Sequence, residues 1–227
     1  MSTALDILVT GGTGYIGCHL IPVLLERGHR VRVLTRAQSA ERVPAGATTV
    51  IGDALDENSV AAALRAGDTM VHLVGTRHPT PSQADQFEKV DLVSIRATVR
   101  AAKSSAIGHL VYVSIAQPAP VNPSYLWIRT LGETMIREAG LTATILRPWR
   151  ILGPGRRWPK AMKPLYKLAE IFPATRATAQ RLASVTLDQF ISALITQVEN
   201  PPARGEWRIV DVVGIKRLAR ERELRAE

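Results

Sequence analysis

Apolar segments alternate with amphipathic segments along most of the chain. Six short apolar or β-branched runs predict strands, at residues 7–9, 30–35, 48–51, 69–74, 109–114 and 207–211. Between the first two runs, apolar residues recur at helical spacing: Ile16, Leu20, Val23 and Leu24. Strands that alternate with helices predict an α/β fold built on a parallel, doubly wound sheet.

The longest helical pattern covers residues 82–102. Its spacing places four apolar side chains on the inner face: Phe87, Val90, Val93 and Ala97. It places three charged side chains mostly on the outer face: Asp91, Arg96 and Arg100. Shorter helices are expected over 57–64, with Asp56 as N-cap, and over 189–198, with Thr186 or Asp188 as N-cap.

A glycine-rich turn joins the first predicted strand to the first predicted helix. Gly11 permits a tight turn, Gly14 lets the backbone approach a pyrophosphate, and Gly17 lets the helix pack closely against the strand. The start of the helix offers free N–H groups and a partial positive charge to phosphates. This context predicts a dinucleotide site, and the alternative is a glycine-rich turn that binds nothing.

The GxxGxxG spacing, preceded by Thr10, resembles the short-chain dehydrogenase/reductase superfamily, and especially its extended and atypical branches. Those branches include sugar-nucleotide epimerases, NmrA-like redox sensors and NAD(P)H-binding subunits associated with complex I. The resemblance extends from residue 5 to about residue 211 and implies a Rossmann fold, with residues 139–148 as a sixth strand. It implies these cofactor contacts: Gly11, Thr13, Gly14, Tyr15, Ile16, Gly17, Asp53, Ala54, Val74, Gly75, Thr76 and Pro148.

The residues after the second strand bear on the choice of cofactor. A carboxylate there commonly holds the ribose 2′-OH of NAD, but no acidic residue lies between Glu26 and Glu41. Arg36 stands there instead, and a guanidinium can pair with a 2′-phosphate. The sequence therefore predicts a preference for NADP(H), with NAD(H) possible. The alternative is that Arg36 is a surface arginine and the adenosine end is loosely held. For Asp53, the alternative to an adenine contact is a structural turn.

In the family that this chain resembles, a tyrosine transfers a proton and a hydroxyl polarises the substrate. A lysine four residues after the tyrosine lowers the pKa of that tyrosine and binds the nicotinamide ribose of the cofactor. Tyr125 and Arg129 occupy the tyrosine and lysine positions, and Ser114 ends the fifth strand. Arginine keeps its proton and has a different reach from lysine, and Ile115 stands where a second hydroxyl is common. The alternative for Tyr125 is an aromatic residue of the core.

Histidines and the lone cysteine give weaker signals. His72 lies within a strand and is expected to be a satisfied core histidine, whereas His78 follows that strand near the nicotinamide end. Cys18 excludes a disulfide framework, and its place on the first helix favours a packing role. No histidine–carboxylate cluster has the spacing of metal ligands, so no metal site is expected.

The last third of the chain leaves the sheet through Gly153, Pro154 and Gly155, and residues 151–183 are expected to form a reduced substrate-side appendage. A basic cluster follows: Arg156, Arg157, Lys160, Lys163 and Lys167. Three interpretations stay open. The segment 156–167 is a lid over an anionic substrate, a surface that touches anionic lipid or a partner protein, or an ordinary solvated helix. The tail 216–227 is expected to be a solvated or frayed helix.

Length and charge set the limits of these interpretations. The 227 residues suit one Rossmann-like domain, 1–227, and the formal charge of +9 does not choose among anionic partners. No nucleic-acid motif accompanies the charge, so DNA or RNA binding is not expected. No run is long enough for a membrane span and no signal peptide is apparent, which favours a cytoplasmic protein.

Two functions fit these observations. The first is an NADP(H)-dependent oxidoreductase or epimerase-like enzyme that acts on a small substrate. Tyr125 would be its acid/base and Arg129 would take the role of the lysine. The basic segment is compatible with an anionic substrate. The second is a dinucleotide-binding protein with little or no turnover, acting as a redox sensor or assembly subunit. Tyr125 and the basic segment favour the first, whereas Arg129 and Ile115 favour the second.

Overall fold

A seven-stranded parallel sheet forms the centre of the protein, which we describe from a computed structural model over residues 4–76, 84–155 and 182–224. The strand order is β3-β2-β1-β4-β5-β6-β9. The strands are β1 Asp6–Thr10, β2 Arg30–Thr35, β3 Thr48–Ile51, β4 Thr69–His72, β5 His109–Val113, β6 Ala143–Arg147 and β9 Trp207–Asp211. The order reverses between β1 and β4, and this switch point opens a crevice at the carboxyl ends of the strands.

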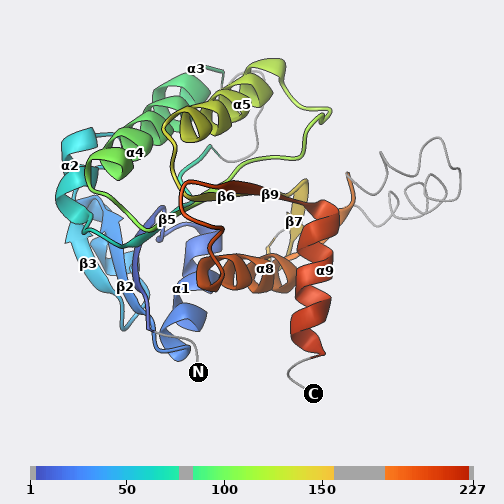
Figure 1. Ribbon diagram of the computed structural model, residues 1–227, viewed down its shortest axis with the longest axis horizontal. Coiled ribbons are helices and arrows are strands. Elements are labelled where there is room, and N and C mark those ends of the chain that lie inside the picture. The colour runs from blue at the N-terminus through green and yellow to red at the C-terminus, as the bar shows by residue number, and fades with distance from the viewer. Residues whose placement is uncertain (1–3, 77–83, 156–181, 225–227) are drawn as a thin grey trace, which may run out of the picture.

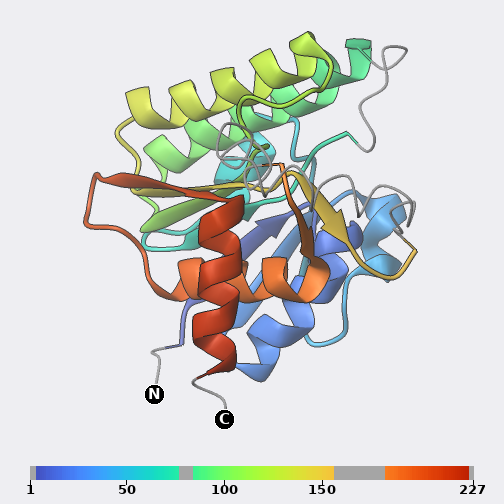
Figure 2. The ribbon, with the colours of Figure 1, turned by 90° about the vertical axis from the view of Figure 1, so that its right-hand side faces the viewer.

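Helices cover both faces of the sheet (Figure 1). One layer contains α1 Tyr15–Glu26, α8 Leu187–Glu199 and α9 Val212–Glu223, and the other contains α2 Glu57–Ala63, α4 Val93–Ser104 and α5 Pro123–Glu138. Figure 2 shows the two layers from the side, with the sheet between them. A short parallel pair, β7 Arg150–Leu152 and β8 Ser184–Thr186, lies outside the main sheet. The expected doubly wound α/β fold is confirmed.

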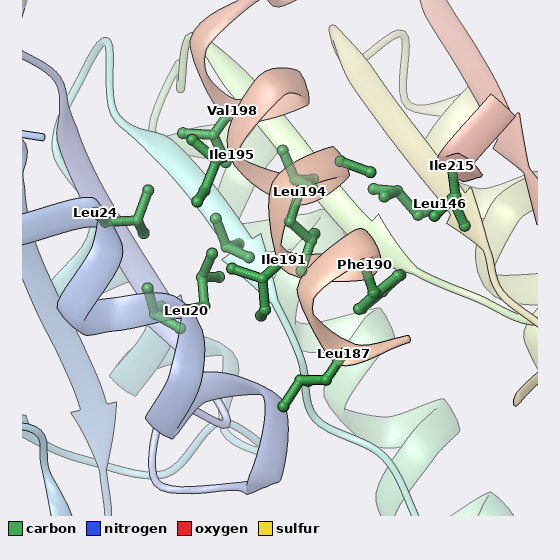
Figure 3. Packing of buried hydrophobic residues seen from close by; sticks show 14 of the residues in the cluster. Leu20, Leu24, Leu146, Leu187, Phe190, Ile191, Leu194, Ile195, Val198 and Ile215 are labelled. Atoms are coloured by element: carbon green, nitrogen blue, oxygen red, sulfur yellow. The ribbon is translucent and has the colours of Figure 1, made fainter. Parts of the chain in front are cut away.

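The largest hydrophobic cluster lies between the sheet, α1 and α8. Figure 3 shows Leu20 and Leu24 of α1 facing Ile191 and Ile195 of α8. All four side chains are buried, which the helical spacing predicted for Leu20 and Leu24. In contrast, Ile16 and Val23 are only partly buried, because Gly17, Ile21 and their neighbours present the inner face of α1.

The strand predictions are confirmed closely in most places. The runs 30–35, 48–51 and 207–211 are strands with the expected bounds, and the fourth strand is shorter because it ends at His72. Asp56 caps α2 by accepting hydrogen bonds from the backbone N–H groups of Asn58 (3.2 Å) and Ser59 (3.0 Å). Thr186 caps α8 through a capping box with Gln189.

The helical pattern 82–102 is interrupted, and one prediction within it is wrong. The structure has α3 Ala84–Gln86, a π-helical segment Phe87–Leu92 (η3), and then α4. Asp91 is buried, with 3% of its surface exposed, although it was expected on the outer face. It follows the buried Phe87 by four residues, which puts both side chains on one helix face, and Arg129 compensates its charge there. Arg96 and Arg100 are exposed as expected.

Two further predictions need correction. The helix of the tail begins earlier than expected, since α9 starts at Val212 and buries Ile215, whereas Ala219 is the one buried residue within 216–224. The apolar positions recur every three or four residues from 212 onward, so a pattern that starts at 216 misses the first of them. Cys18 is exposed on α1 rather than packed in the core, because it lies on the solvent side of that helix.

Candidate functional site: a cavity at the switch point

A cavity of ≈ 770 Å³ opens at the carboxyl ends of the central strands. Its walls come from four segments: the glycine loop after β1, the residues after β4, the connection between β5 and α5, and the residues around β7. Eleven predicted site residues line it together: Gly11, Gly14, Tyr15, Ile16, Val74, Gly75, Thr76, Ser114, Tyr125, Arg129 and Pro148. Thr13, Gly17, Arg36, Asp53 and Ala54 lie outside this lining.

The glycine loop has the backbone geometry that the sequence pattern requires. Gly11 has a φ of +74°, and a Cβ there would lie 2.8 Å from the carbonyl carbon of Leu73. A Cβ on Gly17 would collide with the backbone of Gly12, which explains the close start of α1. Gly14 begins α1 without a side-chain cap and borders the cavity. Its Cβ would meet only the Gly11 oxygen, at 3.1 Å, so the loop presents bare backbone to a ligand.

The residues assigned to the adenosine end do not line the cavity. Arg36 is exposed directly after β2. The Asp53 carboxylate accepts a hydrogen bond from the backbone N–H of Leu55 at 2.9 Å, which is a turn contact. That contact occupies one oxygen of Asp53. The adenine contact of Asp53 and the phosphate contact of Arg36 remain predictions.

The segment after β4 is fixed by a buried carboxylate. Thr76 donates to Oδ2 of Asp91 from its backbone N–H (2.9 Å) and from its hydroxyl (2.5 Å). Gly75 leaves room for the Arg129 guanidinium, which a Cβ at that position would overlap. Asp91 therefore shapes the cavity wall that the resemblance assigns to the cofactor ribose.

Arg129 forms an ion pair with Asp91 inside the protein. Its Nη2 donates to Oδ1 of Asp91, and its Nη1 donates to the carbonyl of Val113 (3.2 Å) and the hydroxyl of Tyr112 (3.4 Å). Only 5% of the Arg129 surface is exposed. Burial alone would lower the pKa of Arg129, but Tyr125, Tyr112 and Asp91 outweigh it and raise that pKa above its ordinary value. The guanidinium thus stays charged.

Tyr125 belongs to the cavity and to the core at once. Its ring packs edge-on against Phe87, with 5.0 Å between the centroids, and lies 5.1 Å from the guanidinium carbon of Arg129. It joins Ile115 and Ile128 in a small apolar cluster and also lines the cavity. Both interpretations of Tyr125 from the sequence therefore describe part of its environment.

Ser114 is tied to a carboxylate that the sequence analysis did not identify as part of the site. Its Oγ donates to Oε1 of Glu133 at 2.5 Å. Glu133, 3% exposed, also accepts from Gln117 (2.9 Å) and forms an ion pair with Arg147. A hydroxyl that donates its one proton to a carboxylate cannot donate it to a substrate carbonyl as well. The signal for Glu133 was an acidic residue one turn after Arg129 on an otherwise apolar helix face.

His72 is a core histidine, as expected. Its Nδ1 lies 3.0 Å from the hydroxyl oxygens of both Thr10 and Thr98, and its Nε2 lies 3.4 Å from that of Ser94. Burial, with a smaller contribution from Arg129, lowers the pKa of His72 to about 3. The ring is therefore neutral and serves to join β1, β4 and α4.

Several predicted features lie outside the described residues: His78, the basic segment 156–167 and most of the appendage 151–183. Within residues 4–76, 84–155 and 182–224, no helix is long and apolar enough to cross a membrane. The same ranges hold no group of three or more histidine, cysteine or acidic side chains with the arrangement of a metal site.

Comparison with known proteins identifies the family and the fold. Residues 11–190 match a protein family described as NAD(P)H-binding. The UDP-glucose 4-epimerase of Thermus thermophilus, solved in complex with NAD, shares the fold with a TM-score of 0.65. That alignment covers 96% of this chain and 83% of the epimerase at 19% identity, so it shows the fold alone.

Among curated proteins, reductases are similar in sequence. The ceramide reductase of Caulobacter vibrioides is 24% identical over 197 residues, which are 86% of this chain and 61% of that protein. A 3-diazoavenalumate denitrifying reductase from Streptomyces is 28% identical over 232 residues, covering 90% of this chain and 75% of that protein. This chain thus spans less than two thirds of the ceramide reductase.

Proposed function

The chain belongs to the NAD(P)H-binding family, and from that premise we propose that it is an NADP(H)-dependent oxidoreductase or epimerase-like enzyme of the short-chain dehydrogenase/reductase type, acting on a small carbonyl or hydroxyl compound. One observation carries this proposal. The bare glycine loop, Tyr125 and Arg129 all border one cavity at the switch point of the sheet.

The residues that border the cavity fit a dinucleotide. Gly14 offers backbone and a helix start to the pyrophosphate, and Gly75 and Thr76 offer a fixed backbone edge to a ribose. Arg36 follows β2 at the position where a 2′-phosphate is recognised in such folds, which supports the preference for NADP(H). NAD(H) remains the second choice of cofactor.

The proposed reaction divides the work between these residues. The reduced nicotinamide, when bound, supplies a hydride to a carbonyl carbon. Tyr125 donates its hydroxyl proton to the carbonyl oxygen, so that the products are an alcohol and the oxidised cofactor. Arg129 keeps its charge, and its guanidinium carbon lies 5.1 Å from the Tyr125 ring, so a positive charge adjoins the residue that donates the proton. Ser114 supports the site by holding Glu133 rather than by donating to the substrate.

Turnover tests this function separately from binding. Purified protein is given NADPH and a panel of carbonyl compounds, and loss of NADPH absorbance is followed. Tyr125→Phe is expected to lower turnover about a hundredfold or more without changing the affinity for NADPH. Trp127→Phe, on the same helix but 57% exposed, is the matched control and should retain full activity. Equal turnover in Tyr125→Phe and the wild type would contradict the assignment.

A second candidate function rests on the same residues. The Arg129 guanidinium is held by Asp91, and the Ser114 proton is held by Glu133, so two of the three catalytic groups are engaged within the protein. This arrangement suits a dinucleotide-binding sensor or assembly subunit with little turnover. Tight NADPH binding without consumption of NADPH by any compound of a broad panel would favour it.

A further inference from the structure

Apolar side chains line part of the cavity. Ile115 and Val121 contribute from the connection between β5 and α5, and Trp149, Ile151 and Leu152 contribute from the residues around β7. Tyr125 also lines the cavity and shares one apolar cluster with Ile115, against which Val121 and Trp149 pack. We refer to the region bordered by these five apolar residues as the substrate half.

The wall of the substrate half continues into a buried hydrophobic cluster. Ile115 is 7% exposed and packs with Phe87, Tyr125 and Ile128, and both Val121 and Trp149 pack against that cluster. Apolar side chains cannot replace the water that a charged group loses on entry. The substrate half therefore favours hydrocarbon over carboxylate or phosphate.

Three polar side chains that line the cavity have hydrogen-bond partners within the protein. Arg129 pairs with Asp91, and Ser114 donates to Glu133. The side-chain oxygen of Asn122 accepts from the backbone N–H of Ser124 at 2.9 Å and caps α5. Arg150 is exposed, with its guanidinium carbon 5.5 Å from the centre of the Trp149 ring. No hydrogen bond to another described residue engages the Tyr125 hydroxyl. In the proposed reaction this hydroxyl donates its proton to the substrate oxygen.

We infer that the substrate is an uncharged ketone, or the matching alcohol, whose carbonyl is flanked by hydrocarbon. This inference rests on the proposed function and adds the substrate class to it. One polar group meets Tyr125, and the hydrocarbon body lies against Ile115, Val121 and Trp149. An anionic substrate, which the basic segment 156–167 suggested from the sequence, would need its charge placed away from this wall.

A homologous series of probes tests the inference by calorimetry on protein saturated with NADP⁺. The series runs from methyl propyl ketone to methyl hexyl ketone, and each ketone is paired with an analogue whose far methyl group is replaced by a carboxylate. Ketone affinity should rise about three- to fourfold for each added CH₂. Each ketone should bind at least about tenfold more tightly than its carboxylate analogue.

Variants locate the effect in the substrate half. Ile115→Thr should lower ketone affinity about fivefold, and Val121→Asp, at a half-buried position, should lower it more strongly. Ile51→Thr is the matched control, because Ile51 is 59% exposed on β3 and lies outside the cavity lining. Thermal melting and nucleotide affinity confirm that each variant is folded.

Each outcome decides one of the two proposals. Carboxylates that bind as tightly as ketones, or a failure of both series to bind the nucleotide-loaded protein, would overturn the inference and leave the proposed function standing. If NADP⁺ itself fails to bind, the proposed function is wrong. The probe pairs are then compared on the nucleotide-free protein by the same tenfold criterion, so the substrate class is still decided.

Discussion

Asp91 and Arg129 form a buried ion pair in which one carboxylate also holds Thr76 at the edge of the cavity. The side chains of the pair are 1% and 6% exposed, so neither charge is compensated by water. The pair links the π-helical segment, α5 and the loop after β4. Both the cofactor binding and the chemistry proposed for the site depend on this pair.

Asp91→Asn should destabilise the protein by about 3 kcal/mol, because it leaves the Arg129 charge buried without a partner. It should also weaken NADPH binding, because Thr76 loses a charged acceptor. Urea unfolding and calorimetric titration measure the two effects. The matched control is Asp85→Asn, whose ion pair with Lys89 is exposed and should contribute less than about 0.5 kcal/mol. Equal free energies of unfolding for the two variants would contradict a structural role for the buried pair.

Ser114→Ala should lower stability by about 1 kcal/mol, because Glu133 keeps its bonds to Arg147 and Gln117. Turnover should fall far less than the roughly hundredfold loss expected for Tyr125→Phe, since the Ser114 proton is directed at Glu133. Steady-state kinetics of both variants with the same ketone provide the comparison. A loss in Ser114→Ala as large as that in Tyr125→Phe would mean that the hydroxyl turns toward the substrate during the reaction.

Arg36→Ala should weaken NADPH binding about tenfold or more and leave NADH binding unchanged, because only NADPH carries the 2′-phosphate. Arg30→Ala is the matched control, since Arg30 is an exposed arginine at the opposite end of β2 and pairs with Asp6. Calorimetric titrations with both nucleotides measure the difference. Equal losses for NADPH and NADH would show that Arg36 does not read the phosphate.

Stability should fall in mild acid because of two buried histidines. Burial lowers the pKa of His72 to about 3 and that of His109 to about 4, with smaller contributions from Arg129 and Arg208. The unfolded chain takes up these protons below about pH 6.5, whereas the folded protein does not, so the free energy of unfolding decreases as pH falls from about 6.5 toward 4. Each histidine contributes up to about 1.4 kcal/mol per pH unit in that window.

His109→Gln should therefore flatten the dependence of stability on pH. Glutamine can keep a bond to the Thr144 hydroxyl, which lies 3.0 Å from His109 Nε2. Urea unfolding between pH 4.5 and 6.5 should show a slope reduced by about 1.4 kcal/mol per pH unit. Trp127→Phe, at an exposed position that carries no titratable group, is the control and should leave the slope as it is in the wild type. An unchanged slope in His109→Gln would refute this source of acid sensitivity.

The sequence was sufficient for the sheet because local signals and the fold agree there. Apolar runs bounded by turn residues predicted β2, β3 and β9 with their bounds, and the glycine spacing predicted the turn at Gly11 and the close helix start at Gly17. The resemblance to short-chain dehydrogenases/reductases predicted that Tyr125 and Arg129 share one site, and both residues line the cavity. These features depend on residues that are close together along the chain.

The sequence did not predict the buried contacts between residues that are far apart along the chain. Asp91 was placed outward although it follows Phe87 by four residues, because the buried partner of its charge, Arg129, comes from a distant part of the chain. Glu133 was not recognised as the partner of Ser114, because their contact joins the end of β5 to the middle of α5. Arg129 and Glu133 are the charged residues among the buried positions of α5, and such residues mark a buried contact without revealing its partner.

Calorimetric titration with NADPH, NADP⁺, NADH and NAD⁺ tests the central claim most directly. The wild type should bind at least the NADP forms clearly, and Gly14→Ala should abolish or strongly weaken that binding while the melting temperature stays close to that of the wild type. A Cβ at Gly14 meets only the Gly11 oxygen, at 3.1 Å, but borders the space assigned to the pyrophosphate. If none of the four nucleotides binds the wild type, or if Gly14→Ala binds them equally well, the glycine loop is not a dinucleotide site.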